Sequence, residues 1–131
     1  MLMITALLLT AFLFGGMLLY SFGFAAFLFS HLPAADAGSI LRKAFPVFYV
    51  WCIVMAGLTA TVFAFLDSLS ALLLAAVAVT TIPARQQLMP AINAATDSGN
   101  KRRFNQLHGL SVLLGLAQIA AVGYVLTRMI L

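Results

Sequence analysis

Four long stretches of this chain carry no acidic or basic side chain: residues 1–35, 44–66, 68–84 and 104–127. Each is long enough, or nearly so, to cross a hydrocarbon core of about 30 Å as a helix. Charged residues make up only 8% of the chain, whereas soluble domains contain about 25%. The sequence therefore predicts an all-α integral membrane protein that forms a single four-helix transmembrane domain over residues 1–131.

The gaps between these stretches place the helices of an up-down bundle. We predict spans at residues 4–30, 45–66, 69–83 and 104–128, joined by cytoplasmic segments at 31–44 and 84–103. Pro33 ends the first helix because its ring and missing N–H disfavour a helix interior. Asp36 is the expected N-cap of the second helix, and Pro46 is expected to kink it. Residues 1–35 lack the basic start of a signal peptide, so we expect a retained span.

The third apolar stretch is the shortest, and it leaves two interpretations open. Its 17 charge-free residues, 68–84, lie at the lower limit for a spanning helix. We favour a span that leaves the bilayer at Pro83 and continues as an amphipathic helix over residues 84–96, kinked at Pro83 and Pro90. The alternative is a re-entrant segment, which would place the two termini on opposite sides.

Basic residues are concentrated in the first and third connections, which share a side in an up-down bundle. Only Arg128 lies on the opposite side, with both termini. The positive-inside rule then places both termini on the non-cytoplasmic side, and we expect a bacterial inner-membrane location. The basic side chains flank apolar runs, which indicates topology or anionic lipid headgroups rather than a nucleic-acid partner. They are Arg42, Lys43, Arg85, Lys101, Arg102 and Arg103.

Small and polar residues predict how the helices pack. Membrane helices associate through close packing and interhelical hydrogen bonds, because lipid is as apolar as leucine. The fourth helix places its polar side chains on one face, which we expect to look into the bundle. The candidate contacts are Gly15, Gly16 and Gly23 on the first helix, and Gly109, Ser111, Gly115, Gln118 and Gly123 on the fourth.

Two histidines and two sulfur side chains are the candidate ligands. His31 and His108 both fall at the cytoplasmic end, and two imidazoles from facing helices can hold a haem b. Cys52 and Met55, which we place at a similar depth, are soft ligands that favour Cu(I). The alternative is structural: His31 ends a helix, His108 bonds within the bundle, and the sulfur residues pack. The single cysteine excludes an intrachain disulfide.

Residues 103–111, Arg-Phe-Asn-Gln-Leu-His-Gly-Leu-Ser, resemble the signature of an uncharacterised four-helix membrane family. Residues 37–40 and 44–49 resemble the start of its second helix. The family includes bacterial proteins and a human transmembrane protein associated with cisplatin resistance. It is distantly similar to copper-resistance D-like proteins and to membrane-bound haem-containing protoporphyrinogen oxidases. The resemblance implies a four-helix fold and favours the haem or copper interpretation. Family members often carry asparagine where this chain has Gly115.

No catalytic pattern accompanies these features. The chain has no phosphate loop, nucleophile elbow or HExxH motif, and no fully intramembrane charge for a proton relay. We therefore expect a non-enzymatic accessory subunit, or an assembly or stability factor, of a larger membrane complex. It would contact the lipid bilayer and either other integral membrane proteins or copies of itself. The alternatives are a haem b or copper protein using His31 and His108, and a small transporter or stress-resistance protein.

Overall fold

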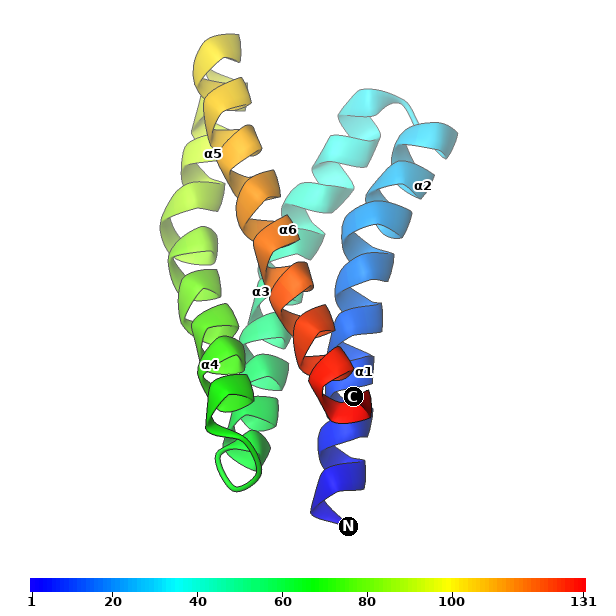
Figure 1. Cartoon of the computed structure of the whole chain (residues 1–131). Coiled ribbons are helices and arrows are strands. Elements are labelled where there is room, and N and C mark those ends of the chain that lie inside the picture. The colour runs from blue at the N-terminus through cyan, green and yellow to red at the C-terminus, as the bar shows by residue number, and fades with distance from the viewer.

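The computed structural model describes all 131 residues and is entirely helical (Figure 1). It contains four helical rods of 30 residues each, Leu2–His31, Ala34–Phe63, Ser68–Asp97 and Lys101–Ile130. All four are long and apolar enough to span a membrane. The chain is therefore a multi-pass integral membrane protein, and the predicted four-helix bundle is confirmed.

Two of the rods contain a short π-helical segment. The first rod consists of α1 (Leu2–Leu18), η1 (Leu19–Phe24) and α2 (Ala25–His31), and the second is α3 (Ala34–Phe63). The third consists of α4 (Ser68–Pro83), η2 (Ala84–Leu88) and α5 (Met89–Asp97), and the fourth is α6 (Lys101–Ile130). A rise of about 1.5 Å per residue makes each rod about 45 Å long.

The third rod continues as a helix beyond Pro83, as predicted for residues 84–96. Pro83 does not end the helix, because the π-helical turn η2 follows it directly and α5 continues to Asp97. The N–H of Met89 donates to the carbonyl of Ala84, five residues back. This wider turn lies directly before Pro90, whose ring and missing N–H disturb the α-helical pairing of the preceding turn. A continuous rod from one end of the bundle to the other excludes the re-entrant alternative.

The helix starts show one wrong prediction. Asp36 does not cap α3; the N-cap is Pro33, and Asp36 lies in the first turn. Side-chain caps occur instead at Asp67, which accepts the N–H of Ser70 at 3.2 Å, and at Asn100, which accepts the N–H of Arg103 at 3.1 Å. These caps satisfy N–H groups that the first helical turn leaves unpaired.

The main core lies at the end of the bundle that contains both termini, which we name the closed end. There α1 packs against α3 and α6, and α4 packs against the same two helices (Figure 1). The buried residues of this core are Ala6, Leu13, Met17, Cys52, Ala56, Phe63, Leu74, Val77, Ile119, Val122 and Val125.

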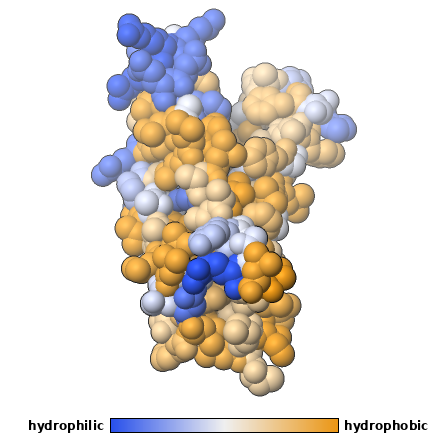
Figure 2. Space-filling model, viewed as in Figure 1, coloured by the Kyte–Doolittle hydropathy of each residue, from blue (hydrophilic) through white to orange (hydrophobic).

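At the opposite end the rods separate into two arms (Figure 1). The first arm contains α2 and the start of α3, with a small core of Leu28, Ala37 and Leu41. The second arm contains α5 and the start of α6, which pack on each other. Figure 2 shows a notch between the arms, with a hydrophilic tip on the second arm and a largely apolar first arm. We name this region the open end.

Candidate functional site

The predicted basic cluster lies on the two arms, and some of its members are engaged. Arg42 on the first arm bonds Asp97 on the second through two contacts, Nη2 to Oδ1 at 2.9 Å and Nη1 to Oδ2 at 3.2 Å. Below this pair, Arg85 of η2 donates to the carbonyl of Pro46 in α3 at 3.1 Å. The arms are therefore linked by arginine side chains rather than by close helix packing. Lys43, Lys101, Arg102 and Arg103 are exposed and form no ion pair.

The polar face of α6 packs into the bundle over only part of its length. Nε2 of Gln118 donates to Thr80 Oγ1 at 2.8 Å and to Thr81 Oγ1 at 3.1 Å, which joins α6 to α4. Ser111 is a neighbour of Tyr49 in α3, whereas His108 is exposed. No residue of α6 before Ile119 is buried. The face that we expected to look into the bundle therefore contacts other rods at Gln118 and Ser111, whereas His108 is exposed at the open end, where the arms diverge.

The glycine contacts also differ from the prediction. A Cβ placed on Gly15, Gly109 or Gly115 would meet no neighbouring atom within 4 Å, so these three do not mediate helix packing. A Cβ on Gly23 would meet only Leu19 of the same rod.

Close approaches between rods occur at two of the predicted glycines, Gly16 and Gly123. A Cβ on Gly16 would lie 2.3 Å from Cη2 of Trp51 in α3. A Cβ on Gly123 in α6 would lie 3.0 Å from Cε2 of Phe14 in α1. Both glycines were among the predicted contacts, and both admit an aromatic ring from another rod.

The structure does not assemble the two predicted histidine ligands into a site. His31 is exposed, stacks on Phe27 at 4.3 Å between ring centroids, and has Nδ1 2.9 Å from the Phe27 carbonyl. His108 stacks on Phe104 at 5.3 Å. Each imidazole therefore lies against an aromatic ring of its own helix. The chain contains no group of three or more His, Cys, Asp or Glu side chains that could hold a metal ion.

The two sulfur residues lie elsewhere in the bundle. Cys52 is 2% exposed and belongs to the core of the closed end, and Met55 packs against that core. Cys52 follows the first residue of α3, Ala34, by 18 positions, or about 27 Å of helix. Placing it at the depth of the histidines was wrong. Its surroundings are those of a packing residue.

A groove between the first rod and α3 was not predicted. We name it the aromatic groove; its volume is about 870 Å³. Tyr20 of η1 stacks on Phe48 with ring centroids 4.0 Å apart, and its Oη is buried without a hydrogen-bond partner. The sequence signal was available in Gly16 and Gly23, which are seven residues apart and fall on one helix face. The groove is lined by Gly16, Leu19, Tyr20, Gly23, Phe24, Phe27, Ala44, Val47, Phe48 and Trp51.

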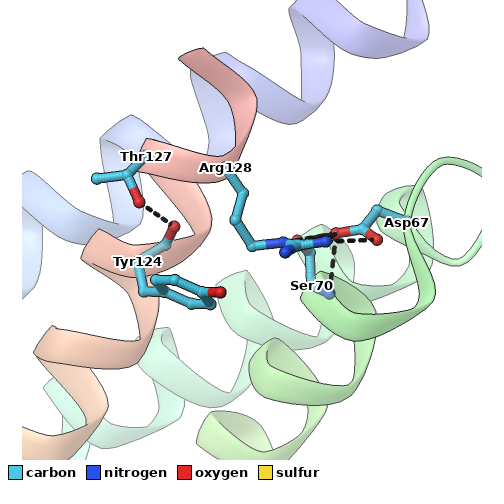
Figure 3. Close-up of polar contacts among 5 residues, drawn as sticks. All are labelled: Asp67, Ser70, Tyr124, Thr127 and Arg128. Carbon is cyan, nitrogen blue, oxygen red and sulfur yellow. Dashed lines mark hydrogen bonds and ion pairs between the residues drawn. The ribbon is translucent and has the colours of Figure 1, made fainter. Parts of the chain in front are cut away.

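Polar contacts at the closed end join the turn between α3 and α4 to the end of α6 (Figure 3). Arg128 Nε and Nη2 each lie 3.1 Å from Asp67 Oδ2, and Nη2 is also 3.1 Å from Oδ1. The guanidinium lies 5.8 Å from the ring centroid of Tyr124. The hydroxyl of Ser70, followed by Arg128, lowers the pKa of Asp67. The arrangement fixes three rods at this end.

Comparison with known proteins gives a family and no activity. No curated protein and no solved structure matches the chain. A family model described as a domain of unknown function (DUF4149) matches residues 8–101, which is more than half of the chain. The matched range includes residues 37–49, which contain the segments that resemble the second helix of the four-helix membrane family, and it excludes residues 103–111. The chain belongs to this DUF4149 family, whose members share a domain of unknown function.

Proposed function

We propose that this membrane protein is an accessory subunit, or an assembly or stability factor, of a larger membrane complex in the bacterial inner membrane. Its basic open end faces the cytoplasm in this proposal, following the positive-inside rule. The observation that supports it is the unburied first part of α6, from Lys101 to Gln118.

The inner face of this part of α6 is unsuited to lipid. His108, Ser111 and Gly115 share one face of the helix, and Ser111 on that face is a neighbour of Tyr49 in α3. Polar side chains at membrane depth are stabilised by other protein groups, because lipid tails offer no hydrogen bonds. A transmembrane helix of another integral membrane protein, placed between the arms, would supply such groups. Such a helix would also pack against both arms, which do not pack closely against each other.

Photocrosslinking from α6 tests this proposal. A photoreactive phenylalanine analogue replaces Leu107, which is half-buried and lies within about 40° of Ser111 around the helix. The matched control replaces Leu113, which is 67% exposed and lies on the opposite side. We expect irradiation of native membranes to give a defined larger species from position 107 and lipid adducts alone from position 113.

The mass of the crosslinked species identifies the partner class. A species of twice the chain mass would show self-association in place of an accessory role. Lipid adducts alone from both positions, together with a lone monomer after mild detergent extraction at native expression, would contradict the proposal.

The haem or copper alternative has less support from the geometry. His31 and His108 stack on separate helices, and Cys52 lies in the core of the closed end. The two histidines lie on different arms, and neither is in contact with Cys52 or Met55 in the contacts described above. An oxidised and reduced absorption spectrum, with iron and copper analysis of the purified protein, tests the alternative. A Soret band or stoichiometric copper that is lost in both His31→Ala and His108→Ala would restore it.

A further inference from the structure

We propose that the aromatic groove binds one acyl chain of an anionic phospholipid, whose phosphate group contacts Lys43. This site is on the first rod and α3, separate from the inner face of α6, so it does not depend on the accessory role.

The dimensions of the aromatic groove suit a hydrocarbon chain. On the first rod its lining extends from Gly16 to Phe27, or about 16 Å of helix at about 1.5 Å per residue. Its volume of about 870 Å³ lies within the range of about 300–1,000 Å³ that is usual for small-molecule sites. Gly23 and Ala44 are small residues in its lining, which leaves space that larger side chains would fill.

The chemistry of the walls favours a chain over a polar ligand. Tyr20 stacks on Phe48 at 4.0 Å and on Phe24 at 5.1 Å, so these rings form a flat apolar surface. The Oη of Tyr20 has less than 1 Å² of accessible area, so it offers no hydrogen bond to a molecule in the groove. None of the lining residues is charged. A flexible acyl chain fits an uncharged aromatic wall of this kind, because it binds through dispersion contacts and needs no hydrogen bond.

Lys43 supplies the charge complement for an anionic headgroup. It precedes Val47, a lining residue that is 70% exposed, by four positions and therefore lies on the same helix face. Its ammonium group has no ion-pair partner, because Asp97 binds Arg42 and Asp67 binds Arg128. Lys43 lies on the arm that carries no other unpaired Lys or Arg. Its position toward the arm tip matches the level of lipid phosphates next to a spanning helix.

The single tryptophan makes the aromatic groove directly observable. Trp51 lines it and is the only tryptophan of the chain, and bromine atoms on an acyl chain quench its fluorescence on contact. The full chain is reconstituted in phosphatidylcholine vesicles that contain a fixed small fraction of chain-brominated phosphatidylglycerol or chain-brominated phosphatidylcholine. We expect about fivefold enrichment of the anionic lipid at Trp51. This is the ratio that corresponds to the attraction of about 1 kcal/mol between one lysine and an anionic membrane surface.

Two matched pairs of variants locate the bound lipid. Lys43→Gln should remove the preference for phosphatidylglycerol, whereas Arg102→Gln, an exposed cation on the other arm, should retain it. Ala44→Phe, which fills the groove, should reduce quenching by both lipids, whereas Ala26→Phe, on an exposed surface outside the groove, should not. Unchanged helical circular dichroism and elution volume show that each variant is folded.

Three results would overturn the proposal. Equal quenching by the two brominated phospholipids would exclude selection of an anionic headgroup. A preference that survives in Lys43→Gln would exclude Lys43 as the contact. A brominated fatty acid that quenches in a Lys43-dependent way, without a phosphatidylglycerol preference, would identify a free fatty acid as the occupant.

Discussion

The closed and open ends are built from the same four rods, yet only one of them is packed. The open end carries most of the basic residues, yet apolar side chains also line its arms, such as Leu28 and Leu41 of the first arm. At the closed end, Gly123 admits the ring of Phe14 and Gln118 bonds the threonines of α4. At the open end, the contacts between the arms are made by long side chains, Arg42 to Asp97 and Arg85 to the carbonyl of Pro46. Small residues and interhelical hydrogen bonds, rather than apolar surface, therefore decide where these membrane helices pack.

The comparison also separates two kinds of polar contact. The ion pair between Asp67 and Arg128 joins two rods that already pack on common neighbours, with Ser70 holding the carboxylate. The pair between Arg42 and Asp97 crosses a gap and has side chains that are 41% and 63% exposed. Only the first pair is supported by surrounding structure. The following predictions test this difference, from the largest expected effect to the smallest.

Leu74→Ala should be the most destabilising of these changes. Leu74 is fully buried in the core of the closed end, and its removal leaves a cavity. The unfolded helix in lipid is already in an apolar medium, so the loss is mainly of packing, and we expect about 2 kcal/mol, the lower end for buried leucines. Leu113→Ala, at a 67% exposed position of α6, should leave the free energy of unfolding unchanged. Reversible unfolding in detergent by denaturant measures both, and equal losses would contradict a core confined to the closed end.

Gly16→Ala should destabilise the contact between the first rod and α3. Its Cβ would lie 2.3 Å from Trp51, so the indole must move, at a cost of about 1–3 kcal/mol. Gly115→Ala meets no neighbour and should instead stabilise the helix by about 0.5–1 kcal/mol. Thermal melts compare the two variants, and Trp51 emission reports the displacement in Gly16→Ala. Destabilisation by Gly115→Ala would show that α6 is packed where we find it open.

The Asp67 cluster should make the closed end sensitive to acid. The pKa of Asp67 is lowered by Ser70 and Arg128, so the folded state favours the carboxylate. Its stabilisation is complete above the ordinary aspartate pKa of about 3.9 and is lost as the pH falls through the lowered value. Asp67→Asn should be less stable than the parent chain at pH 7 and should show a smaller further decrease below pH 4. Melting temperatures from pH 7 to pH 2 measure both effects. If the parent chain and Asp67→Asn lost stability in parallel as the pH falls, protonation of Asp67 would not account for the acid sensitivity.

Asp97→Asn should have the smallest effect on stability. The ion pair with Arg42 is exposed, and such pairs contribute less than about 1 kcal/mol and weaken with salt. We expect a small decrease in melting temperature at low salt that disappears at 1 M salt. A loss as large as that of Leu74→Ala would show that the arms are held together more tightly than their contacts indicate.

The sequence was sufficient for the spans and for the placement of basic residues at one end, because both depend on composition along the chain. It also predicted the helical extension of the third rod beyond Pro83, but not the π-helical turn η2 within it. It also could not identify which glycines make contacts. Gly16 and Gly115 are alike in the sequence, and only the position of Trp51 distinguishes them. The divergence of the arms is a property of packing between rods, which no single segment encodes.

The separation of the arms can be measured directly by pulsed electron paramagnetic resonance in lipid nanodiscs. Spin labels at Ala35 and Ser98 report on the arm tips, and labels at Leu66 and Ile130 report on the closed end, both in a Cys52→Ala background. We predict a long, broad distance distribution for the arm pair and a short, narrow one for the closed-end pair. Short, narrow distributions for both pairs, as expected for helices packed about 8–10 Å apart throughout, would contradict an open end.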